Sequence, residues 1–522
     1  MRLHVEPSPW LVWPHAMKSG LCLHGFQERP VTGSPEYVVS DSLRRLGAIV
    51  SLSQAGSCAS ARKAEFQGEI ASYWGMQHHQ TKQNLLLLNR PQQACELFAL
   101  SDPRQTIPSG QETVWLSTDT ASLKSHYKRM VGRRAKVRAP ETPCFYIKLQ
   151  SHPDVQAPLP EHLLAWISPH VDPNDAERLI SWFANKSSLS NRWIALELPG
   201  AANSPIYCLN VLSGSVKPNR GTRFGLRAAR RRTPVVEHLI PTIIRSSNLD
   251  VLDRTEIHSR DLSGTAQRLK DAHVVCVGVG SLGSTVAMQL ARSGVGRLTL
   301  IDPDTLEAPN LGRHVLGTDE LGRSKAVALR DRIRRDLPTI DVDALPTFLE
   351  LALYEHSAIF ERADLVIVTT ADWHSEDALW RAKSAEANWG LLQAWSEPHS
   401  LIGHALLAPA GLHDARHLFT ENGEFKYRCS NWPAGGIIPL PGCGQSFIPG
   451  GSLGMANIAS MVAQAAVALL SGEAAQAFWF SSINRPEDVA ALGGEYLGPK
   501  LPDGTHHVQL QRAWPECAEG SE

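Results

Sequence analysis

The 522-residue chain has a net charge of −1 at neutral pH, because 52 aspartates and glutamates nearly balance 51 lysines and arginines. This balance gives no overall attraction to nucleic acid or to anionic lipid, and neither is expected as a partner. Nine cysteines lie scattered, without the spacing of a disulfide framework and without a C-x-x-C pair. The pattern favours a reducing compartment, the cytoplasm, and predicts no structural zinc. No leader sequence is visible, and the longest apolar helix, 458–470, is expected to be too short to cross a membrane.

The first predicted segment, residues 1–85, combines a cysteine motif with a helical run. A Pro-His pair ending at His15 precedes a Gly-x-Cys-Leu motif that contains Cys22. Further on, the pattern E-F-x-x-E-x-x-x-Y-W runs from Glu65 to Trp74. Together these motifs resemble the active-site region of bacterial ubiquitin-conjugating-enzyme-like domains. The resemblance implies an α+β domain in which the Cys22 thiol accepts an acyl group as a thioester and passes it to an amine.

This segment is short for a conjugating fold. Only 21 residues precede Cys22, whereas such folds place most of their sheet before the cysteine. A truncated domain is therefore expected, and two roles stay open for Cys22: a thioester thiol, or a small buried residue in a strand.

The middle segment, residues 86–250, carries no chemical motif. Strands are expected near 144–149 and 193–198, with a helix near 175–183. We interpret the segment as a linking region or as an inactive adenylation-like fold. Its basic runs are interpreted as solvated loops, since they lack the interleaved aromatic residues of a nucleic-acid reader.

The third segment, residues 251–522, opens with a glycine-rich turn between a strand and a helix. An apolar, β-branched run from His273 leads into Gly278, Gly280 and Gly283, as in a buried parallel strand followed by a nucleotide-binding loop. The next strand ends at Asp302, about 20 residues past the last glycine, where a carboxylate suits a ribose hydroxyl. The turn and the helix after it predict a site for a nucleotide phosphate.

Three polar side chains follow the second strand. They are the amide of Asn310, the guanidinium of Arg313 and the ammonium of Lys325. A nicotinamide-dependent dehydrogenase does not need such a cluster. A nucleoside triphosphate does, because a departing pyrophosphate needs fixed donors and cations where its charge develops.

These motifs, with a later strand that ends at Asp372, resemble the adenylating domain of the ThiF, MoeB and ubiquitin-activating enzyme superfamily. The resemblance covers about the last half of the chain. It implies ATP with its ribose on Asp302, its phosphates on Arg313, Lys325 and Asn310, and Mg²⁺ on Asp372. For Asp372 a helix N-cap is the alternative role. The superfamily also implies a homodimer and an arginine supplied in trans, with Arg254 and Arg260 as the two candidates.

The resemblance further implies a thioester-forming cysteine after the adenylation core. Cys443 lies in a loop rich in glycine and proline, just before a predicted helix, and is the favoured nucleophile. Cys429 is the competing candidate. Cys276, inside the first strand, is expected to be a core residue without chemistry.

The expected fold class is α/β: a Rossmann-like doubly wound sheet of the ThiF type, preceded by a partial α+β conjugating-enzyme-like domain and a mixed linking region. The expected function is ATP-dependent adenylation of a partner's C-terminal carboxylate, with thioester transfer through Cys443 and Cys22 to an amine. Such fusions resemble the conjugation enzymes of bacterial anti-phage (CBASS-type) operons, so the partner would be a ubiquitin-like protein or a nucleotidyltransferase. The alternatives are a sulfur-carrier adenylyltransferase, a non-catalytic nucleotide-binding scaffold and, last, a dehydrogenase.

Overall fold

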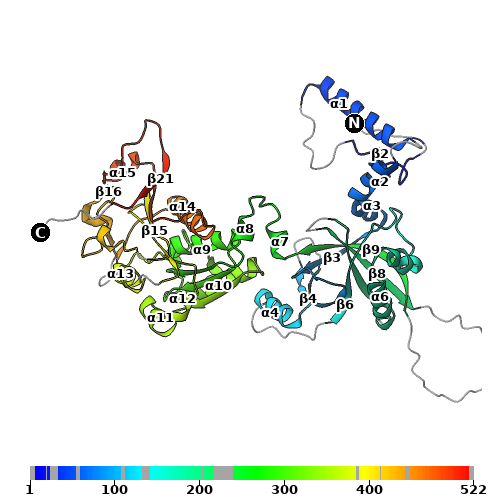
Figure 1. Cartoon of the computed structure of the whole chain (residues 1–522), viewed down its shortest axis with the longest axis horizontal. Helices are drawn as coiled ribbons and strands as arrows, with labels where there is room; N and C mark the ends of the chain where they lie inside the picture. Colours follow the sequence, from blue (N-terminus) through cyan, green and yellow to red (C-terminus); the bar gives the residue numbers. More distant parts are fainter. Residues whose placement is uncertain are drawn as a thin grey trace, which may run out of the picture. The chain divides into compact units, whose positions relative to one another are not determined.

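The computed structural model describes residues 6, 8–18, 20–23, 33–54, 59–106, 112–131, 141–187, 189–200, 204–215, 239–383, 387–411, 413–440 and 446–515. The chain divides into two compact units, Met1–Asp253 and Arg254–Glu522 (Figure 1). The junction lies three residues beyond the boundary expected at residue 250.

Unit 1 begins with a two-strand hairpin, β1 (Ala16–Met17) and β2 (Gly20–Leu21), followed by three helices. The helices are α1 (Pro35–Ser53), α2 (Ala59–Gly68) and α3 (Ile70–Gln77). Trp74 on α3 is fully buried in a core that it shares with residues of the barrel described next. Its indole Nε1 donates to the carbonyl of Asp154 at 3.0 Å.

The rest of unit 1 is a closed barrel with mixed parallel and antiparallel pairing, in the order β3-β5-β4-β6-β7-β8-β9. Its strands are β3 (Gln80–Leu87), β4 (Cys95–Thr106), β5 (Glu112–Ser117), β6 (Glu141–Lys148), β7 (Asn191–Glu197), β8 (Ile206–Ser215) and β9 (Leu239–Val251). Helices α4 (Thr120–Val131), α5 (Leu163–Ile167) and α6 (Pro173–Asn185) lie between the strands in sequence. The segment boundary expected at residue 85 falls inside β3, and β3 pairs with β9 at the far end of the segment.

Unit 2 is built on an eight-stranded sheet in the order β12-β11-β10-β13-β14-β15-β19-β21. The strands are β10 (His273–Val277), β11 (Arg297–Ile301), β12 (Asp341–Leu345), β13 (Leu365–Val368), β14 (Gly390–Ser396), β15 (Ile402–Ala408), β19 (Phe478–Asn484) and β21 (His507–Ala513). The first five strands in this order run parallel, and β15, β19 and β21 continue the sheet with antiparallel pairing.

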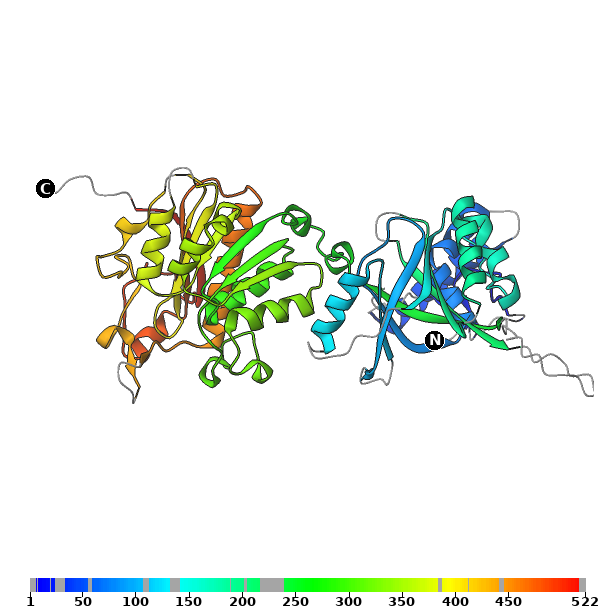
Figure 2. The ribbon, with the colours of Figure 1, turned by 90° about the horizontal axis from the view of Figure 1, so that it is seen from below.

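Helices cover both faces of this sheet (Figures 1 and 2). On one face Val274 and Cys276 share a core with α9 (Ser281–Arg292), α10 (Lys325–Asp336) and α14 (Ser452–Leu470). On the other face Val275 and Val277 share a core with α11 (Leu349–Glu355), α12 (Ser357–Glu361) and α13 (Trp373–Ala382). The alternation follows the two-residue period of a strand. The predicted doubly wound α/β fold is confirmed.

Helix α14 corrects one expectation. It spans 19 residues and is long and apolar enough to cross a membrane, so the expectation that it is too short was wrong. Its residues Ile458, Val462 and Ala466 are buried in the core that also contains α9. This packing is that of a central helix in a globular domain.

Candidate nucleotide-binding site

A cavity of about 700 Å³ lies at the carboxyl ends of the parallel strands in unit 2. In an open α/β sheet this edge is where ligands bind. The predicted nucleotide residues that line it are Gly278, Gly280, Asp302, Asn310, Arg313, Lys325 and Asp372. Residues from four different parts of the sequence thus meet around one space.

The three glycines of the loop differ in what surrounds them. Gly278 has φ of +78°, and a Cβ there would lie 3.0 Å from backbone atoms of Thr369 and Thr370. A Cβ on Gly283 would lie 1.9 Å from the carbonyl oxygen of Gly278, so this glycine lets α9 pack closely on its own loop. Gly283 does not line the cavity, so the structure shows a packing role for it, and its cofactor contact stays a prediction. A Cβ on Gly280 would meet nothing within 4 Å.

The first turn of α9 faces the cavity. Its N-cap is Gly280, which supplies no capping side chain, and Ser281 and Leu282 also line the space. The backbone N–H groups of this turn carry the positive end of the helix dipole, which favours an anion such as a phosphate.

Asp302 is buried and anchored to the loop. Its carboxylate accepts from the backbone N–H of Val279 at 2.7 Å and of Asp304 at 2.9 Å. Burial raises the pKa of this carboxyl, while these two hydrogen bonds and the Lys325 charge oppose the rise. A carboxylate has about four acceptor positions, so further lone pairs remain for a ribose hydroxyl.

The cations of the site differ in their present partners. The Nζ of Lys325 lies 2.8 Å from a carboxylate oxygen of Asp304. Within the described part of the chain, the guanidinium of Arg313 forms no ion pair. Asn310 is held by its amide oxygen, which accepts from Glu307 N–H at 3.0 Å. Among the described residues, Lys325 thus has a carboxylate partner in the site and Arg313 has none.

For Asp372 the structure shows the N-cap role, and its predicted role in holding Mg²⁺ stays a prediction. It is the N-cap of α13, where it accepts from Ser375 N–H at 3.1 Å and from Ser375 Oγ at 2.7 Å. It also lines the cavity. Burial would raise the pKa of its carboxyl, but the hydrogen bonds from Ser375 outweigh that effect and lower the pKa. The side chain is therefore ionised at neutral pH.

Sequence reasoning missed part of the lining. Trp395 at the end of β14 and Phe447 from the hairpin β17 (Ile438–Pro439) and β18 (Ser446–Phe447) both face the cavity. The strand-end rule could have pointed to Trp395, because β14 is the next parallel strand. Nothing in the sequence indicates that the hairpin reaches the cavity, because its contacts with Pro398 and His399 join residues far apart in sequence.

The predicted thiols have separate outcomes. Cys443 lies outside the described residues, between β17 and β18. Cys429 is buried, and burial raises the pKa of its thiol to about 12, which disfavours it as a nucleophile. Cys276 is buried inside β10, as expected for a core residue.

The two motifs of unit 1 meet in space around His15. The backbone N–H of Cys22 donates to the His15 carbonyl at 2.7 Å, and the His15 N–H donates to the Tyr73 hydroxyl at 2.6 Å. The imidazole lies 3.3 Å from a carboxylate oxygen of Glu65 and 3.4 Å from one of Glu69. Cys22 is half-buried. The backbone of Cys22 is therefore bonded to His15, whose imidazole lies beside two carboxylates.

The two arginines considered for action in trans do not line the cavity of their own chain. The guanidinium of Arg254 donates to the carbonyls of Ala266, at 2.6 Å, and of Gly294. It thus binds just past the C-terminus of α9, whereas the cavity faces the N-terminus of that helix. Arg260 is exposed.

Comparisons with known proteins agree with this geometry. Residues 255–389 match the ThiF family. MoeZ of Mycobacterium tuberculosis, named a probable adenylyltransferase/sulfurtransferase, is 31% identical over 216 residues, covering 40% of this chain and 49% of MoeZ. Cap2 of Pseudomonas aeruginosa, named an ATP-dependent ubiquitin transferase-like protein, is 25% identical over 256 residues, covering 48% of this chain and 44% of Cap2. The chain thus spans about half the length of the curated relatives that it matches.

A crystal structure of E. coli MccB with ATP is similar at a TM-score of 0.32 and 17% identity, over 43% of this chain and 67% of that chain. The family match begins before β10 and ends at the residue before β14, so it contains the glycine loop and Asp302 through Asp372. Unit 2 therefore contains a segment that matches the ThiF family model.

Proposed function

We propose that the protein uses ATP and Mg²⁺ to adenylate the C-terminal carboxylate of a protein partner. The observation that carries this proposal is the gathering of the predicted ribose, phosphate and metal residues around one cavity. The ThiF match over these same residues supports it, as do the names of the relatives.

In the proposed reaction the partner's carboxylate oxygen attacks the α-phosphorus of ATP. A new P–O bond forms to the carboxylate, the bond to the β-phosphate oxygen breaks, and pyrophosphate leaves. Asp302 holds the ribose, while Arg313, Lys325 and the first turn of α9 hold the phosphates, with Asn310 beside them. Fixed donors of this kind stabilise the charge that develops on the departing group.

The metal ion is assigned to Asp372. Mg²⁺ is usually bound by one or two carboxylates together with substrate phosphates, and it keeps several waters. A single ionised and exposed carboxylate at the cavity wall fits that requirement. When bound there, Mg²⁺ would neutralise charge on the triphosphate.

The proposal continues with a thioester relay. The Cys443 thiolate attacks the acyl carbon of the adenylate and AMP leaves, and the Cys22 thiol then receives the acyl group before an amine attacks it. Two observations support this: Ser446 and Phe447, just after Cys443 in sequence, line the cavity, and the backbone of Cys22 bonds to His15, whose ring lies beside Glu65 and Glu69. The relay replaces one difficult amide-forming step by several easier ones.

The likeness to Cap2, named for ubiquitin transfer, favours a ubiquitin-like protein or a nucleotidyltransferase as the partner. We also propose a role in bacterial anti-phage defence, on the resemblance of the sequence motifs to the conjugation enzymes of such operons. We place the enzyme in the cytoplasm as a homodimer, without a membrane or nucleic acid as a partner. The second candidate function is sulfur-carrier adenylation, which the 31% identity to MoeZ favours.

A non-reducing gel after incubation with MgATP and candidate partners separates these functions. The relay predicts a DTT-sensitive adduct in the wild type that is lost in Cys443→Ser and in Asp372→Ala. In Cys22→Ser the adduct should persist, while the amine-linked product is lost. Adenylate formation without any adduct would favour the sulfur-carrier function. Absence of ATP binding would favour a non-catalytic scaffold, and NAD binding without ATP binding would favour a dehydrogenase.

A further inference from the structure

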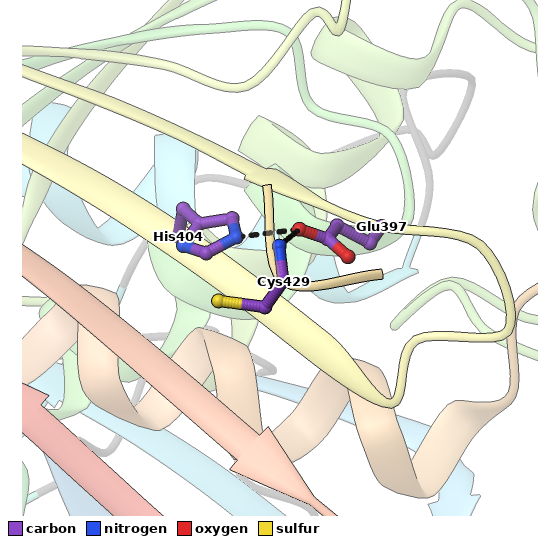
Figure 3. Close-up of side chains that lie close together, drawn as sticks. All are labelled: Glu397, His404 and Cys429. Atoms are coloured by element: carbon purple, nitrogen blue, oxygen red, sulfur yellow. Dashed lines mark hydrogen bonds and ion pairs between the residues drawn. The ribbon is translucent and has the colours of Figure 1, made fainter. Parts of the chain in front are cut away.

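Three buried side chains outside the cavity form a compact cluster: Glu397, His404 and Cys429 (Figure 3). The Nε2 of His404 lies 2.8 Å from Oε1 of Glu397, and the backbone N–H of Cys429 donates to the same oxygen at 2.7 Å. The hydroxyl of Ser430 donates to the other carboxylate oxygen. Both oxygens of Glu397 are therefore occupied by donors.

The tautomer of His404 follows from its second partner. The indole Nε1 of Trp479 lies 3.2 Å from His404 Nδ1, and an indole N–H can only donate. Nδ1 is therefore the acceptor, and Nε2 carries the proton that it donates to Glu397. The ligand atoms of the cluster lie within 4.8 Å of one another, close enough for a metal ion. The hydrogen-bonded arrangement is nevertheless complete, since Glu397 and His404 both have their partners.

Glu397 is the first residue of the turn between β14 and β15, and this turn contacts one end of a segment that we call the arm. We define the arm as the described residues 430–440 and 446–450. At its first end, Glu397 holds Cys429 and Ser430. Trp432 then stacks on His399 with ring centroids 4.6 Å apart. Close by, a Cβ on Gly436 would lie only 2.4 Å from the Pro398 ring.

The same turn also contacts the second end of the arm. The backbone N–H of His399 donates to the carbonyl of Pro449 at 2.5 Å. A Cβ on Gly450 would lie 2.5 Å from Ser400 Oγ. His399 and Ser400 hold positive φ angles of 65° and 55°, which side chains rarely adopt unless the surroundings impose them. The contacts on both sides fix this uncommon turn.

Between its two ends the arm reaches the cavity. Ser446, Phe447 and Ile448 line the cavity wall. The arm also exposes a group of large apolar side chains, namely Ile437, Ile438, Leu440, Phe447 and Ile448. The position of this wall is therefore set by the contacts at the turn.

We infer that Glu397 is a positioning residue for the partner's C-terminal segment, acting by fixing the arm that forms one wall of the adenylation cavity. This inference rests on the proposed function. Glu397 touches neither ATP nor the partner in this account. Its loss should therefore weaken use of the partner much more than use of ATP.

The first test compares Glu397→Leu with Glu397→Gln in the full-length protein. Leucine removes both acceptors, whereas the glutamine oxygen still accepts from His404 and Cys429. In ATP–pyrophosphate exchange we expect Glu397→Leu to raise the KM for the partner about tenfold and to leave the KM for ATP within about twofold. Glu397→Gln should recover most of the loss. Hydrogen exchange of 430–440 and 446–450 should accelerate in Glu397→Leu, with β10 to β13 unchanged.

A second pair of variants leaves the buried cluster intact, in case Glu397→Leu fails to fold. Gly435 and Gly436 both have positive φ, at +66° and +73°. An alanine at 436 would clash with Pro398, whereas a Cβ at 435 meets nothing within 4 Å. Both variants therefore carry similar backbone strain. Only Gly436→Ala should raise the KM for the partner and accelerate hydrogen exchange of the amides in the arm.

Three results would overturn the inference. The first is that folded Glu397→Leu and Gly436→Ala both keep the wild-type KM for the partner and the wild-type rate of amide hydrogen exchange in the arm. Another is equal effects of Gly435→Ala and Gly436→Ala. The third is stoichiometric zinc in the purified wild type that disappears in Cys429→Ser, which would make the cluster a metal site. If the wild type shows no ATP–pyrophosphate exchange with any partner, the proposed function fails. Hydrogen exchange of the backbone amides in the arm still decides whether Glu397 fixes the arm.

Discussion

Arg313 and Lys325 both line the cavity, but only Lys325 has a carboxylate partner among the described residues. A phosphate that binds Arg313 displaces no carboxylate of the described residues, so we expect this guanidinium to contribute more to the proposed reaction. We predict that Arg313→Ala lowers the rate of ATP–pyrophosphate exchange about 100-fold. Arg323→Ala is the matched control, because Arg323 pairs with Asp331 at 2.6 Å and does not line the cavity. Equal losses in both variants would contradict the assigned role.

Glu376, in the first turn of α13, gives a prediction about pH. It is buried, accepts from Gln393 at 2.7 Å and from Thr370 at 3.3 Å, and burial raises its pKa to about 7. The folded protein therefore binds this proton more tightly than the unfolded chain, whose glutamate has its ordinary pKa of 4.5. The stability from this group is full below pH 4.5 and declines as the pH rises towards 7.

Glu376→Gln should remove this part of the pH dependence. The amide cannot ionise, so the variant should be more stable than the wild type above pH 7, and the two should converge near pH 4.5. Urea unfolding midpoints between pH 4.5 and 8 measure the difference. A constant gap across that range would show that Glu376 titrates normally.

That Asp302, Arg313, Lys325 and Asp372 line one cavity could be predicted from the sequence. Each lies in a local motif after a strand, and parallel strands bring their carboxyl ends together. Glu397 and His404 could not be found in this way. Their partners Cys429 and Ser430 lie 32 and 33 residues beyond Glu397, and no local pattern marks that contact.

At the scale of elements, the junction between β10 and α9 depends on two glycines with different neighbours. Gly283→Ala would bring a methyl group within 1.9 Å of the Gly278 carbonyl, and overpacking of this kind costs about 1–3 kcal/mol of unfolding free energy. Gly280→Ala faces open space at the cavity, with φ of −73°. We predict a lower unfolding midpoint for Gly283→Ala only, and a raised KM for ATP in Gly280→Ala. Reversed outcomes would mean that the two glycines have been assigned the wrong roles.

The elements of unit 2 were predictable because buried parallel strands read as short apolar runs, and the helices between them are amphipathic. The barrel of unit 1 was not. Its closure joins β3 to β9, for example Leu87 to Val251, and such distant pairing leaves no periodic signal. The strands β6 and β7 were expected from their composition, but their place in a closed barrel was not.

At the scale of the whole molecule, each of the two units contains residues that the proposed reaction uses. Unit 2 holds the nucleotide cavity, and unit 1 holds Cys22 beside His15. The helices with the conjugating-type motif do not form a separate core, because Trp74 packs with the barrel residues Phe145 and Ile194. Substitutions in that shared core should therefore disturb Cys22 as well as the barrel.

The most direct test of the proposed adenylation is ATP–pyrophosphate exchange by the full-length protein with ubiquitin-like proteins and nucleotidyltransferases as candidate partners. We predict Mg²⁺-dependent exchange that needs the partner's free carboxyl terminus. Exchange should be lost in Asp302→Ala and Asp372→Ala and retained in Cys443→Ser and Cys22→Ser. Exchange that survives in Asp302→Ala and Asp372→Ala, or that is absent with every partner while ATP does not bind, would contradict the assignment of this cavity to adenylation.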